Sequence, residues 1–435
     1  MSLAEATQGV AQIGSIFTNA ARLNITAAVR TRSRGVRGWV GATNTGYDPL
    51  DRATAAQPYA AYAALHRGAR VHYNPKRATW ILHRLDDVRA AMRDTDQVTS
   101  SEGVTRFKIA APVVALTDGE QHAVLRRQAM PGFTTGALES WQQKIEDLAA
   151  ELVGDVIANP GGDVVERLAI PLPMKVIAYL LGVPDRDIDD FRRWSEAGVR
   201  IIDFEPSLRG IAQSSKALGS VFALRRYFLA QFAGGLEPDT VLGRLVAHNT
   251  EGNLSHEELF LIAMLLLIAG NETTTSLLGG MFDTLARNPE QFDMIRSAPE
   301  LIPIAVEEHL RFTSPIQNTF RYTRADYVVG DVCIPKGSRV LLSFGAANRD
   351  PEAFPDPDEF HADRNPRTHV GFGYGAHMCI GAPLARMEAQ AVLRQLVERT
   401  SRISATGDTR WSEHISLRGP THLPVTLTPA LEGTD

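Results

Sequence analysis

The residues best suited to chemistry lie in a glycine-rich loop late in the chain. The loop, HVGFGYGAHMCIG, runs from His369 to Gly381 and contains Cys379, one of two cysteines. Glycines allow the backbone to approach a large flat group closely and to point N–H donors at a sulfur. A helical pattern follows from Ile380, and the positive N-terminal end of such a helix would stabilise a thiolate. These features favour a single thiolate ligand at Cys379.

Two other interpretations of this loop are weaker. Gly371, Gly373 and Ala376 satisfy the dinucleotide-binding pattern G-x-G-x-x-A, but that pattern requires a hydrophobic strand directly before it. The segment ADRNPRTH stands there instead, so a nucleotide-dependent reductase remains only an alternative. A structural zinc site needs more ligands than His377 and Cys379 supply.

A second group of polar residues lies in the middle of a long apolar helix. Ser255 and Glu258 form a capping-box signature, and the helical pattern continues to Arg287, which predicts a helix about 50 Å long. Glu272 and Thr273 interrupt its apolar run. A carboxylate there is rarely buried without a partner or a function, and beside a hydroxyl it could relay protons into a dry site. A threonine alone would more often bond the carbonyl one turn back.

A third group is the segment EEHLR, in which Glu308 and Arg311 are i,i+3 neighbours on a predicted helix. By itself such a pair is usually a solvated ion pair worth less than about 1 kcal/mol. Only its position between the other two groups gives it weight.

The composition of the chain limits the classes of function. A net charge of −5 over 435 residues leaves no global basic field, which argues against nucleic acid as the main partner. The absence of a disulfide framework and of a recognisable cleaved signal predicts a cytoplasmic protein. The longest apolar run, LFLIAMLLLIAG, is shorter than the roughly 20 residues needed to cross a bilayer, so no transmembrane anchor is expected. The second cysteine, Cys333, is expected to be a small buried hydrophobe.

Helical patterns dominate the chain, which predicts a mainly α fold with a smaller β-rich part. RVHYNPKRATWILH contains two short strand-like runs, and YVVGDVCIPKGSRVLL is predicted to be a hairpin with PKG at its turn. Residues 1–46 form a basic N-terminal extension, and residues 47–435 are predicted to be a single domain. The extension has a loose helical period: an arm docked on its own protein is favoured over a helix lying on a membrane.

Along the chain the three groups occur in the order long helix, EEHLR segment and glycine-rich loop. Together and in that order they resemble the cytochrome P-450 family of heme-thiolate monooxygenases, in its soluble bacterial form. The loop from Phe372 to Gly381 matches F-G-x-G-x-H-x-C-x-G at every fixed position, and AGNETT matches [AG]-G-x-[DE]-T-T. Glu308 to Arg311 matches E-x-x-R. The resemblance extends from about Tyr47 to near the C-terminus. It implies the fold of this family, with the long central helix lying over heme.

The resemblance implies that heme b (iron protoporphyrin IX) binds with Cys379 as the axial ligand of its iron, since a thiolate favours O–O cleavage. Backbone N–H groups near Gly381 would hydrogen-bond the sulfur. Glu308 and Arg311 would form a buried triad with Arg364 that braces the loop. The remaining residues expected to contact heme or its propionates are His122, Arg126, Arg321, His377 and Phe372.

On the other side of the heme, Ala269 and Gly270 would mark the point where the central helix opens to admit oxygen. Glu272 and Thr273 resemble the acid–alcohol pair that delivers protons during oxygen activation. The resemblance therefore implies a monooxygenase that uses O2 and two external electrons to hydroxylate or otherwise oxidise an apolar small molecule. A fatty acid, terpenoid, steroid or aromatic substrate would each fit. The expected pocket residues are Leu265, Ile268, Ile316 and Thr319, with loops around 104–113 and 200–208.

The implied electron donors are a ferredoxin and its reductase, docking near Cys379 through basic residues such as Arg127. The chain is expected to be a monomer. A heme-thiolate protein that binds a gas without turnover remains an alternative, and it would need the Cys379 loop but not Glu272 and Thr273.

Overall fold

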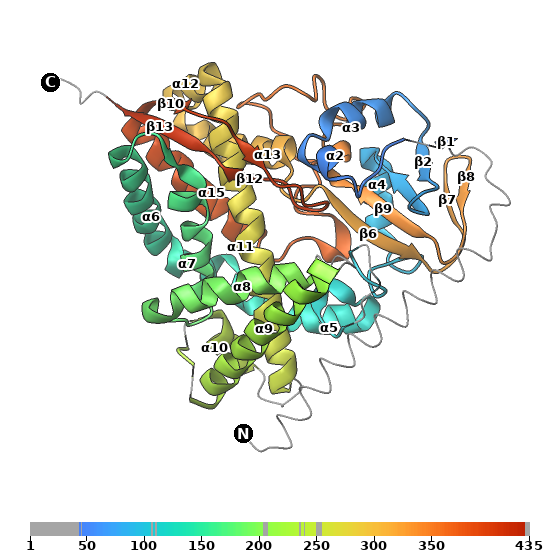
Figure 1. Cartoon of the computed structure of the whole chain (residues 1–435), viewed down its shortest axis with the longest axis horizontal. Helices are drawn as coiled ribbons and strands as arrows, with labels where there is room; N and C mark the ends of the chain where they lie inside the picture. Colours follow the sequence, from blue (N-terminus) through green and yellow to red (C-terminus); the bar gives the residue numbers. More distant parts are fainter. Residues whose placement is uncertain are drawn as a thin grey trace.

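The computed structural model describes residues 43–430 apart from 45, 106–107, 109–110, 203–207, 235, 239 and 249–254. Helices make up most of this part, and the strands gather mainly in one six-stranded sheet at one side (Figure 1). The predicted class, mainly α with a smaller β-rich part, is confirmed. The predicted extension, residues 1–46, lies almost entirely outside the described residues.

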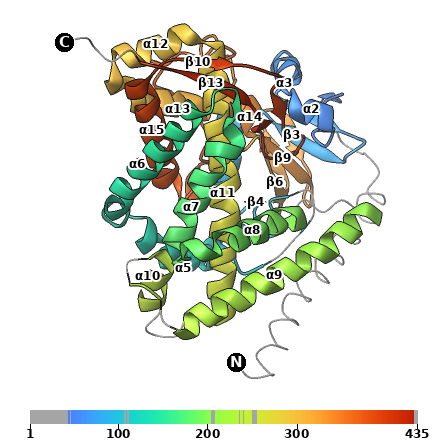
Figure 2. The same ribbon diagram turned by 60° about the vertical axis from the view of Figure 1, so that its left-hand side comes forward.

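Helix α11 (His256–Arg287) crosses the whole body of the molecule (Figure 2). It begins with the predicted capping box, in which the Glu258 N–H donates to Ser255 Oγ and the Ser255 N–H donates to the Glu258 carboxylate. It ends at Arg287, before Pro289 starts the next helix. Within the described part of the chain it is the one helix long and apolar enough to cross a membrane. It packs against α7 (Pro171–Leu180) and other helices, and this packing buries much of its apolar surface inside the protein.

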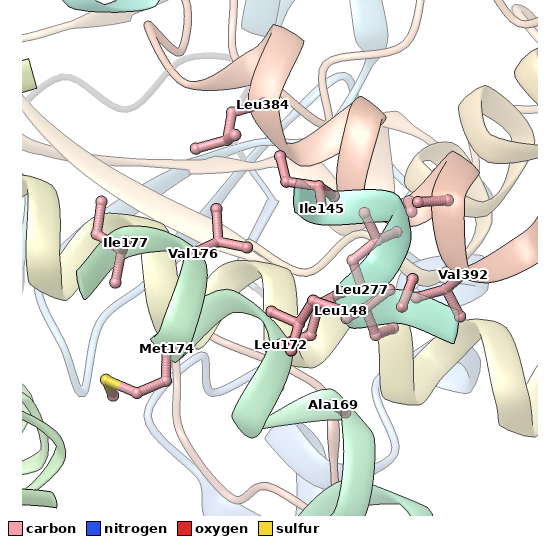
Figure 3. Packing of buried hydrophobic residues seen from close by; sticks show 14 of the residues in the cluster. Ile145, Leu148, Ala169, Leu172, Met174, Val176, Ile177, Leu277, Leu384 and Val392 are labelled. Carbon is pink, nitrogen blue, oxygen red and sulfur yellow. The ribbon is translucent and has the colours of Figure 1, made fainter. Parts of the chain in front are cut away.

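The largest hydrophobic core joins α11 to helices from several parts of the chain. Burying each large aliphatic side chain stabilises the fold by about 1.5–3 kcal/mol. This core fixes α15 (Ala382–Arg399), which directly follows the Cys379 loop, relative to α11, which carries Glu272. Figure 3 labels core residues from α6, α7, α11 and α15: Ile145, Leu148, Leu172, Val176, Leu277, Leu384 and Val392.

The six-stranded sheet has the order β1-β2-β3-β9-β6-β4. The two predicted strand-like runs are β2 (Val71–Asn74) and β3 (Thr79–Leu82), which pair antiparallel. Strand β9 (Arg339–Ser343) lies parallel to β3 and antiparallel to β6 (Asn318–Thr323). Strand β6 carries Thr319 and Arg321 and therefore holds two predicted site residues on a paired strand.

The predicted hairpin exists, but its turn is elsewhere. Strands β7 (Tyr327–Val329) and β8 (Val332–Ile334) pair antiparallel around Gly330, whose φ is +62°. The PKG segment instead leads from β8 to β9 through Gly337, at φ +77°. Both segments contain a glycine that permits positive φ. The residue types alone therefore did not indicate which of the two segments forms the hairpin turn.

Cys333 is exposed, so the prediction that it is buried is wrong. It lies opposite Val328 on the outer face of the β7–β8 hairpin. Successive side chains of a strand point to opposite faces, and only the inner face of this hairpin is covered. Val329 and Val332 take the buried positions instead.

The remaining elements complete the helical body and three small β units. The other α-helices are α2 (Arg52–Ala56), α3 (Tyr59–His66), α4 (Leu85–Arg93), α5 (Gly119–Ala129), α6 (Thr135–Ala158), α8 (Ile188–Ile202), α9 (Leu208–Gly234), α10 (Val241–His248), α12 (Pro289–Ser297), α13 (Ile302–Thr313) and α14 (Phe344–Ala347). The short helical turns are η1 (Val114–Leu116), η2 (Met130–Phe133), η3 (Val165–Ala169), η4 (Asp185–Asp187), η5 (Pro299–Leu301) and η6 (Gly375–His377). The other strands are β1 (Thr43–Asn44), β4 (Val98–Thr99), β5 (Gly162–Asp163), β10 (Thr400–Ala405), β11 (Arg410–Trp411), β12 (Pro420–His422) and β13 (Pro424–Pro429).

Candidate active site

The Cys379 loop is a tight backbone structure that ends where α15 begins. Gly373 and Gly375 have φ values of +73° and +71°, in the left-handed region that glycine adopts at little cost. The Cys379 N–H donates to the Phe372 carbonyl at 2.8 Å and so closes the loop. The glycines of the motif are therefore needed for the loop geometry as well as for room beside the cysteine.

The surroundings of Cys379 suit a metal-bound sulfur. Its side chain is exposed, but desolvation by the surrounding protein raises the pKa of its thiol, against the backbone N–H groups of Gly381 and Ala382 and the charges of Arg126 and Arg386, which lower it. Coordination to a metal ion deprotonates a thiol outright. Within the described ranges no group of three or more His, Cys, Asp or Glu forms a metal site. A single protein ligand fits a metal whose other ligands come from a cofactor.

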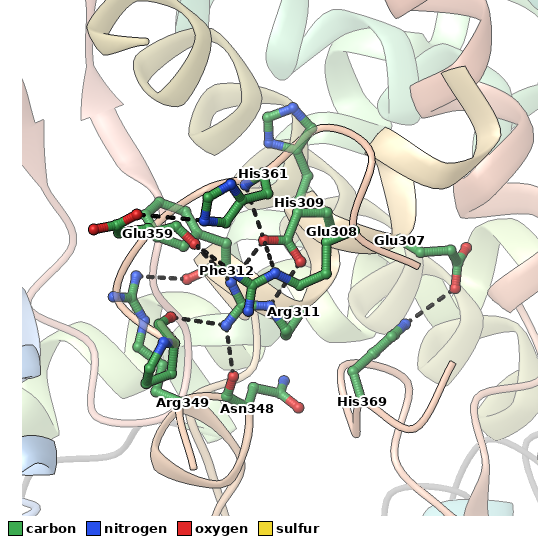
Figure 4. Close-up of polar contacts among 12 residues, drawn as sticks. Glu307, Glu308, His309, Arg311, Phe312, Asn348, Arg349, Glu359, His361 and His369 are labelled. Carbon is green, nitrogen blue, oxygen red and sulfur yellow. Dashed lines mark hydrogen bonds and ion pairs between the residues drawn. The ribbon is translucent and has the colours of Figure 1, made fainter. Parts of the chain in front are cut away.

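The structure brings the predicted triad of Glu308, Arg311 and Arg364 together, and Figure 4 shows the Glu308–Arg311 pair. Arg311 donates from Nε and Nη2 to the two carboxylate oxygens of Glu308, each at 2.7 Å. Arg364 Nε lies 3.3 Å from Glu308 Oε1. Glu308 and Arg311 are fully buried, and Arg311 Nη1 also donates to the carbonyls of Asn348 and Pro357 at 2.9 and 2.8 Å. The interior ion pair is thus fully hydrogen-bonded.

His377 is held by a protein carboxylate that sequence reasoning missed. Its Nε2 lies 3.0 Å from Asp118 Oδ1. Asp118 Oδ2 accepts the N–H groups of Ser100 and Ser101, both at 3.0 Å, and the Thr99 hydroxyl. Burial alone would raise the pKa of Asp118, but the hydrogen bonds from His377 and Thr99 hold it well below its usual range. Asp118 is the residue before α5 (Gly119–Ala129), but its side chain makes no capping bond there, so no local sequence signal pointed to its contact with His377.

His122 connects α5 to the same loop. Its Nε2 lies 3.0 Å from the Ala376 carbonyl and its Nδ1 lies 2.9 Å from the Val114 carbonyl. The imidazole rings of His122 and His377 are 4.1 Å apart between centroids. The two predicted histidines therefore lie together, at the turn just before Cys379.

Two predicted arginines in this region form no ion pair with an acidic residue among the residues that the structure describes. Arg321 is 5% exposed and donates to Thr319 Oγ1, at 3.0 Å, and the Phe320 carbonyl, at 2.8 Å. Burial lowers the pKa of Arg321 to about 10, although the charge of nearby Asp118 acts in the opposite direction. Arg126 is half-buried. Because a buried cation without an anion is costly, these residues fit a ligand with carboxylates, as the heme propionates are.

The predicted opening of the central helix at Ala269 and Gly270 is not seen. Helix α11 stays regular through both residues, and the Thr273 hydroxyl donates to the Ala269 carbonyl at 2.7 Å. This is the bond one turn back that threonine commonly makes. Ala269 is nevertheless exposed in the middle of a largely buried helix. The interior is therefore accessible at this point.

Glu272 lies half-buried next to Thr273. Burial raises the pKa of its carboxyl, Glu196 raises it further, and Arg192 lowers it. Its neighbour Asn271 is 3% exposed, and its Oδ1 has no hydrogen-bond partner. Asn271 therefore does not face solvent, and the acid beside it holds its proton more strongly than an exposed glutamate.

The predicted pocket residues are partly buried. Leu265 and Ile268 are half-buried on α11, as are Ile316 and Thr319 in and before β6. Ile316 forms an isolated antiparallel bridge with Leu417, a residue that sequence reasoning did not consider. Of the predicted pocket loops, residues 203–207 of the segment around 200–208 and part of the segment around 104–113 lie outside the described residues.

Comparisons with known proteins give one consistent result. The family model described as cytochrome P-450 matches residues 297–412. The beta-dihydromenaquinone-9 omega-hydroxylase of Mycobacterium tuberculosis is 44% identical over 423 residues, which is 97% of this chain and 86% of that protein. The 6-deoxyerythronolide B hydroxylase of Saccharopolyspora erythraea is 37% identical over 319 residues, 72% of this chain and 77% of that protein. A solved structure, CYP109Q5 from Chondromyces apiculatus, has a TM-score of 0.78 and 32% identity, covering 90% of this chain and 100% of that chain.

The chain therefore belongs to the cytochrome P-450 family. It has the fold of this family, with α11 as the long central helix. It is a monooxygenase that oxidises small molecules, and its cofactor is heme, iron protoporphyrin IX.

Proposed function

We propose that this cytochrome P-450 hydroxylates a long isoprenoid chain, such as the side chain of a lipid quinone, near its end. The observation that carries the proposal is the 44% identity to the omega-hydroxylase of M. tuberculosis along 97% of this chain. Half-buried apolar side chains at Leu265, Ile268 and Ile316 suit an aliphatic substrate.

Cys379 is the proposed ligand of the heme iron, which when bound supplies the oxidising chemistry of the reaction. The N–H groups of Gly381 and Ala382 hold the sulfur in place. Arg126 and Arg321 are the proposed partners of the propionates because neither guanidinium forms an ion pair with an acidic residue among the described residues. His122 and His377 shape the same edge, and the ring of Phe372 lies in the loop before the cysteine.

Glu272 and Thr273 are the proposed proton carriers. Burial raises the pKa of the Glu272 carboxyl, so it retains a proton more readily than an exposed glutamate does. The Thr273 hydroxyl, beside exposed Ala269, can receive that proton on its oxygen while passing its own onward. This pairing favours turnover over simple gas binding.

The proposed electron donors are an acidic ferredoxin and its reductase. The surface next to the Cys379 loop carries three exposed apolar side chains, Val124, Met130 and Met378. Arg127 is exposed on the same helix as Val124. An apolar surface beside a cation such as Arg127 suits an acidic partner. The positive charge would steer the approach of that partner. We further infer that the enzyme works in the cytoplasm as a monomer.

The substrate proposal is tested with purified enzyme, a bacterial ferredoxin and reductase, reduced nicotinamide cofactor and O2. Menaquinones with isoprenoid chains of several lengths are compared with palmitic acid and testosterone. We expect a product that is one oxygen atom heavier and is modified near the end of the isoprenoid chain. Oxidation of palmitic acid or testosterone alone would contradict the substrate proposal while leaving the family assignment intact.

A further inference from the structure

His369, the first residue of the Cys379 loop, matches no fixed position of the motif, yet the structure gives it two defined partners. Its Nδ1 accepts the Gly371 N–H at 3.0 Å. Its Nε2 lies 3.0 Å from Glu307 Oε2. Because Nδ1 accepts, the ring hydrogen is on Nε2 and is donated to Glu307. The His369 side chain is 4% exposed, so this arrangement lies inside the protein.

Glu307 also binds a residue on the far side of the cysteine. Arg386 donates from Nε to Glu307 Oε1 at 2.6 Å and from Nη2 to Glu307 Oε2 at 2.9 Å. Glu307 belongs to α13 and Arg386 to α15. One carboxylate therefore ties the start of the Cys379 loop to the helix that follows it (Figure 4 shows the Glu307–His369 contact). The neighbouring carboxylate, Glu308, serves the separate triad with Arg311.

Arg386 connects this cluster to Phe372, the residue whose carbonyl accepts the Cys379 N–H. Its guanidinium carbon lies 4.5 Å from the centroid of the Phe372 ring. The Phe372 carbonyl accepts the Cys379 N–H at 2.8 Å. Arg386 also lies close enough to Cys379 for its positive charge to act on the sulfur. The carbonyl that holds the Cys379 backbone and the charge near the sulfur thus both involve Arg386, which Glu307 holds and neutralises.

We propose that His369, Glu307 and Arg386 form a positioning clamp that fixes the Cys379 loop and balances the charge beside its sulfur. The proposal rests on the proposed role of Cys379 as the heme ligand. None of the three residues is assigned a contact with substrate or iron, so none is called catalytic. Their action is on the geometry and the electrostatic potential at the sulfur.

The charge balance makes a prediction that a purely structural ion pair does not make. Glu307→Gln leaves Arg386 uncompensated near the sulfur, so the reduction potential of the heme should rise. Arg386→Leu leaves Glu307 uncompensated, so the potential should fall. The double variant should return towards the wild-type value, because both charges are then gone.

His369→Ala and Arg386→Lys test the positioning role separately from the charge. The first removes one arm of the clamp without removing an arginine or a carboxylate. The second keeps the charge but loses the planar, two-point contact with Glu307. In both we expect the ratio of thiolate-ligated to unligated carbon monoxide complex to fall about tenfold, which is about 1.4 kcal/mol. The potential should move less than in Glu307→Gln.

The chain offers a matched control on the same helix. Arg394 donates to Glu146 at 2.9 Å, with exposed fractions of 40% and 19% for the two side chains. The corresponding fractions for Arg386 and Glu307 are 35% and 21%. Arg394→Leu removes an equivalent ion pair of α15 that does not reach the Cys379 loop. It should leave the potential and the carbon monoxide spectrum unchanged.

The measurements are redox titration and carbon monoxide difference spectra of each heme-loaded variant, with thermal unfolding as the check on folding. Opposite shifts of the potential in Glu307→Gln and Arg386→Leu support the clamp. Shifts of equal sign, or shifts no larger than that of Arg394→Leu, overturn it. If the wild type itself lacks a thiolate-type spectrum, the role of Cys379 fails instead. If one charge variant does not fold, Arg386→Lys and His369→Ala still decide the positioning role.

Discussion

At the scale of single residues, the two cysteines show how surroundings decide what a thiol can do. Cys333 lies on the outer face of a two-stranded hairpin and has no role in the site. Cys379 receives backbone N–H groups from Gly381 and Ala382, yet desolvation by the surrounding protein raises the pKa of its thiol. The thiolate therefore depends on a metal to stay ionised at neutral pH.

The Thr273 hydroxyl is the group whose removal should most cleanly separate electron use from product formation. In Thr273→Ala we expect the enzyme to keep consuming reductant but to divert it to hydrogen peroxide, with product per electron falling about tenfold. Thr273→Ser, which keeps a hydroxyl, should retain most of the coupling. Product and peroxide are measured against reductant consumed. An unchanged product yield in the alanine variant would remove Thr273 from the proton path.

Glu388 on α15 should make the protein less stable as pH rises. Its side chain is 2% exposed, its Oε2 has no hydrogen-bond partner, and burial raises its pKa from 4.5 to about 8. Because the folded-state pKa is the higher one, the stabilisation is present below about pH 4.5 and is lost as pH rises towards 8.

The variant Glu388→Met removes the ionisable group and fills a similar volume. Urea unfolding should show that its stability advantage over the wild type is about 4 kcal/mol larger at pH 8 than at pH 4.5. A constant difference between the two pH values would mean that Glu388 does not titrate in this range.

Residues that belong to a fixed motif could be predicted from the sequence, and their partners could not. Cys379, Glu308 and Arg311 were identified by type and spacing. The partners Asp118 and Glu307 were missed because His377 and Asp118 are 259 positions apart, so only the folded chain defines their contact.

At the scale of elements, the proposed brace of the Cys379 loop is the buried ion pair of Glu308 and Arg311 on α13. Removing Glu308 leaves the guanidinium of Arg311 buried without a charge partner, which costs about 3–5 kcal/mol. We expect Glu308→Ala to yield protein that does not retain heme, measured as heme per polypeptide. His361→Ala, which removes a partly exposed partner of Glu359, is the control and should keep its heme. Normal heme content in Glu308→Ala would refute the bracing role.

Elements with complete local signals were predicted well. The start of α11 was correct because the capping box of Ser255 and Glu258 involves only residues of one turn. The hairpin turn was misplaced because Gly330 and Gly337 both adopt positive φ, and strand pairing chose between them. The expected opening at Ala269 stays a prediction: α11 is continuous there, and the Thr273 hydroxyl donates to the Ala269 carbonyl.

At the scale of the whole molecule, the proposed ferredoxin surface lies next to the Cys379 loop. Arg127→Glu should raise the ferredoxin KM about tenfold at low salt with little change in kcat, and the difference should shrink as salt is added. Arg402→Glu is a control, because Arg402 is exposed on β10, far from α5 in Figures 1 and 2. Steady-state reduction rates at several ionic strengths make the test. Equal effects of the two substitutions would contradict this docking surface.

The carbon monoxide difference spectrum of the reduced, heme-loaded protein tests the central claim most directly. The account predicts a strongly red-shifted Soret band in the wild type, which an intact thiolate ligand produces. Cys379→Ser should bind heme without that band, and Cys333→Ser should keep it. A wild type without the red-shifted band, or a Cys379→Ser variant that retains it, would contradict the assignment of Cys379 as the iron ligand.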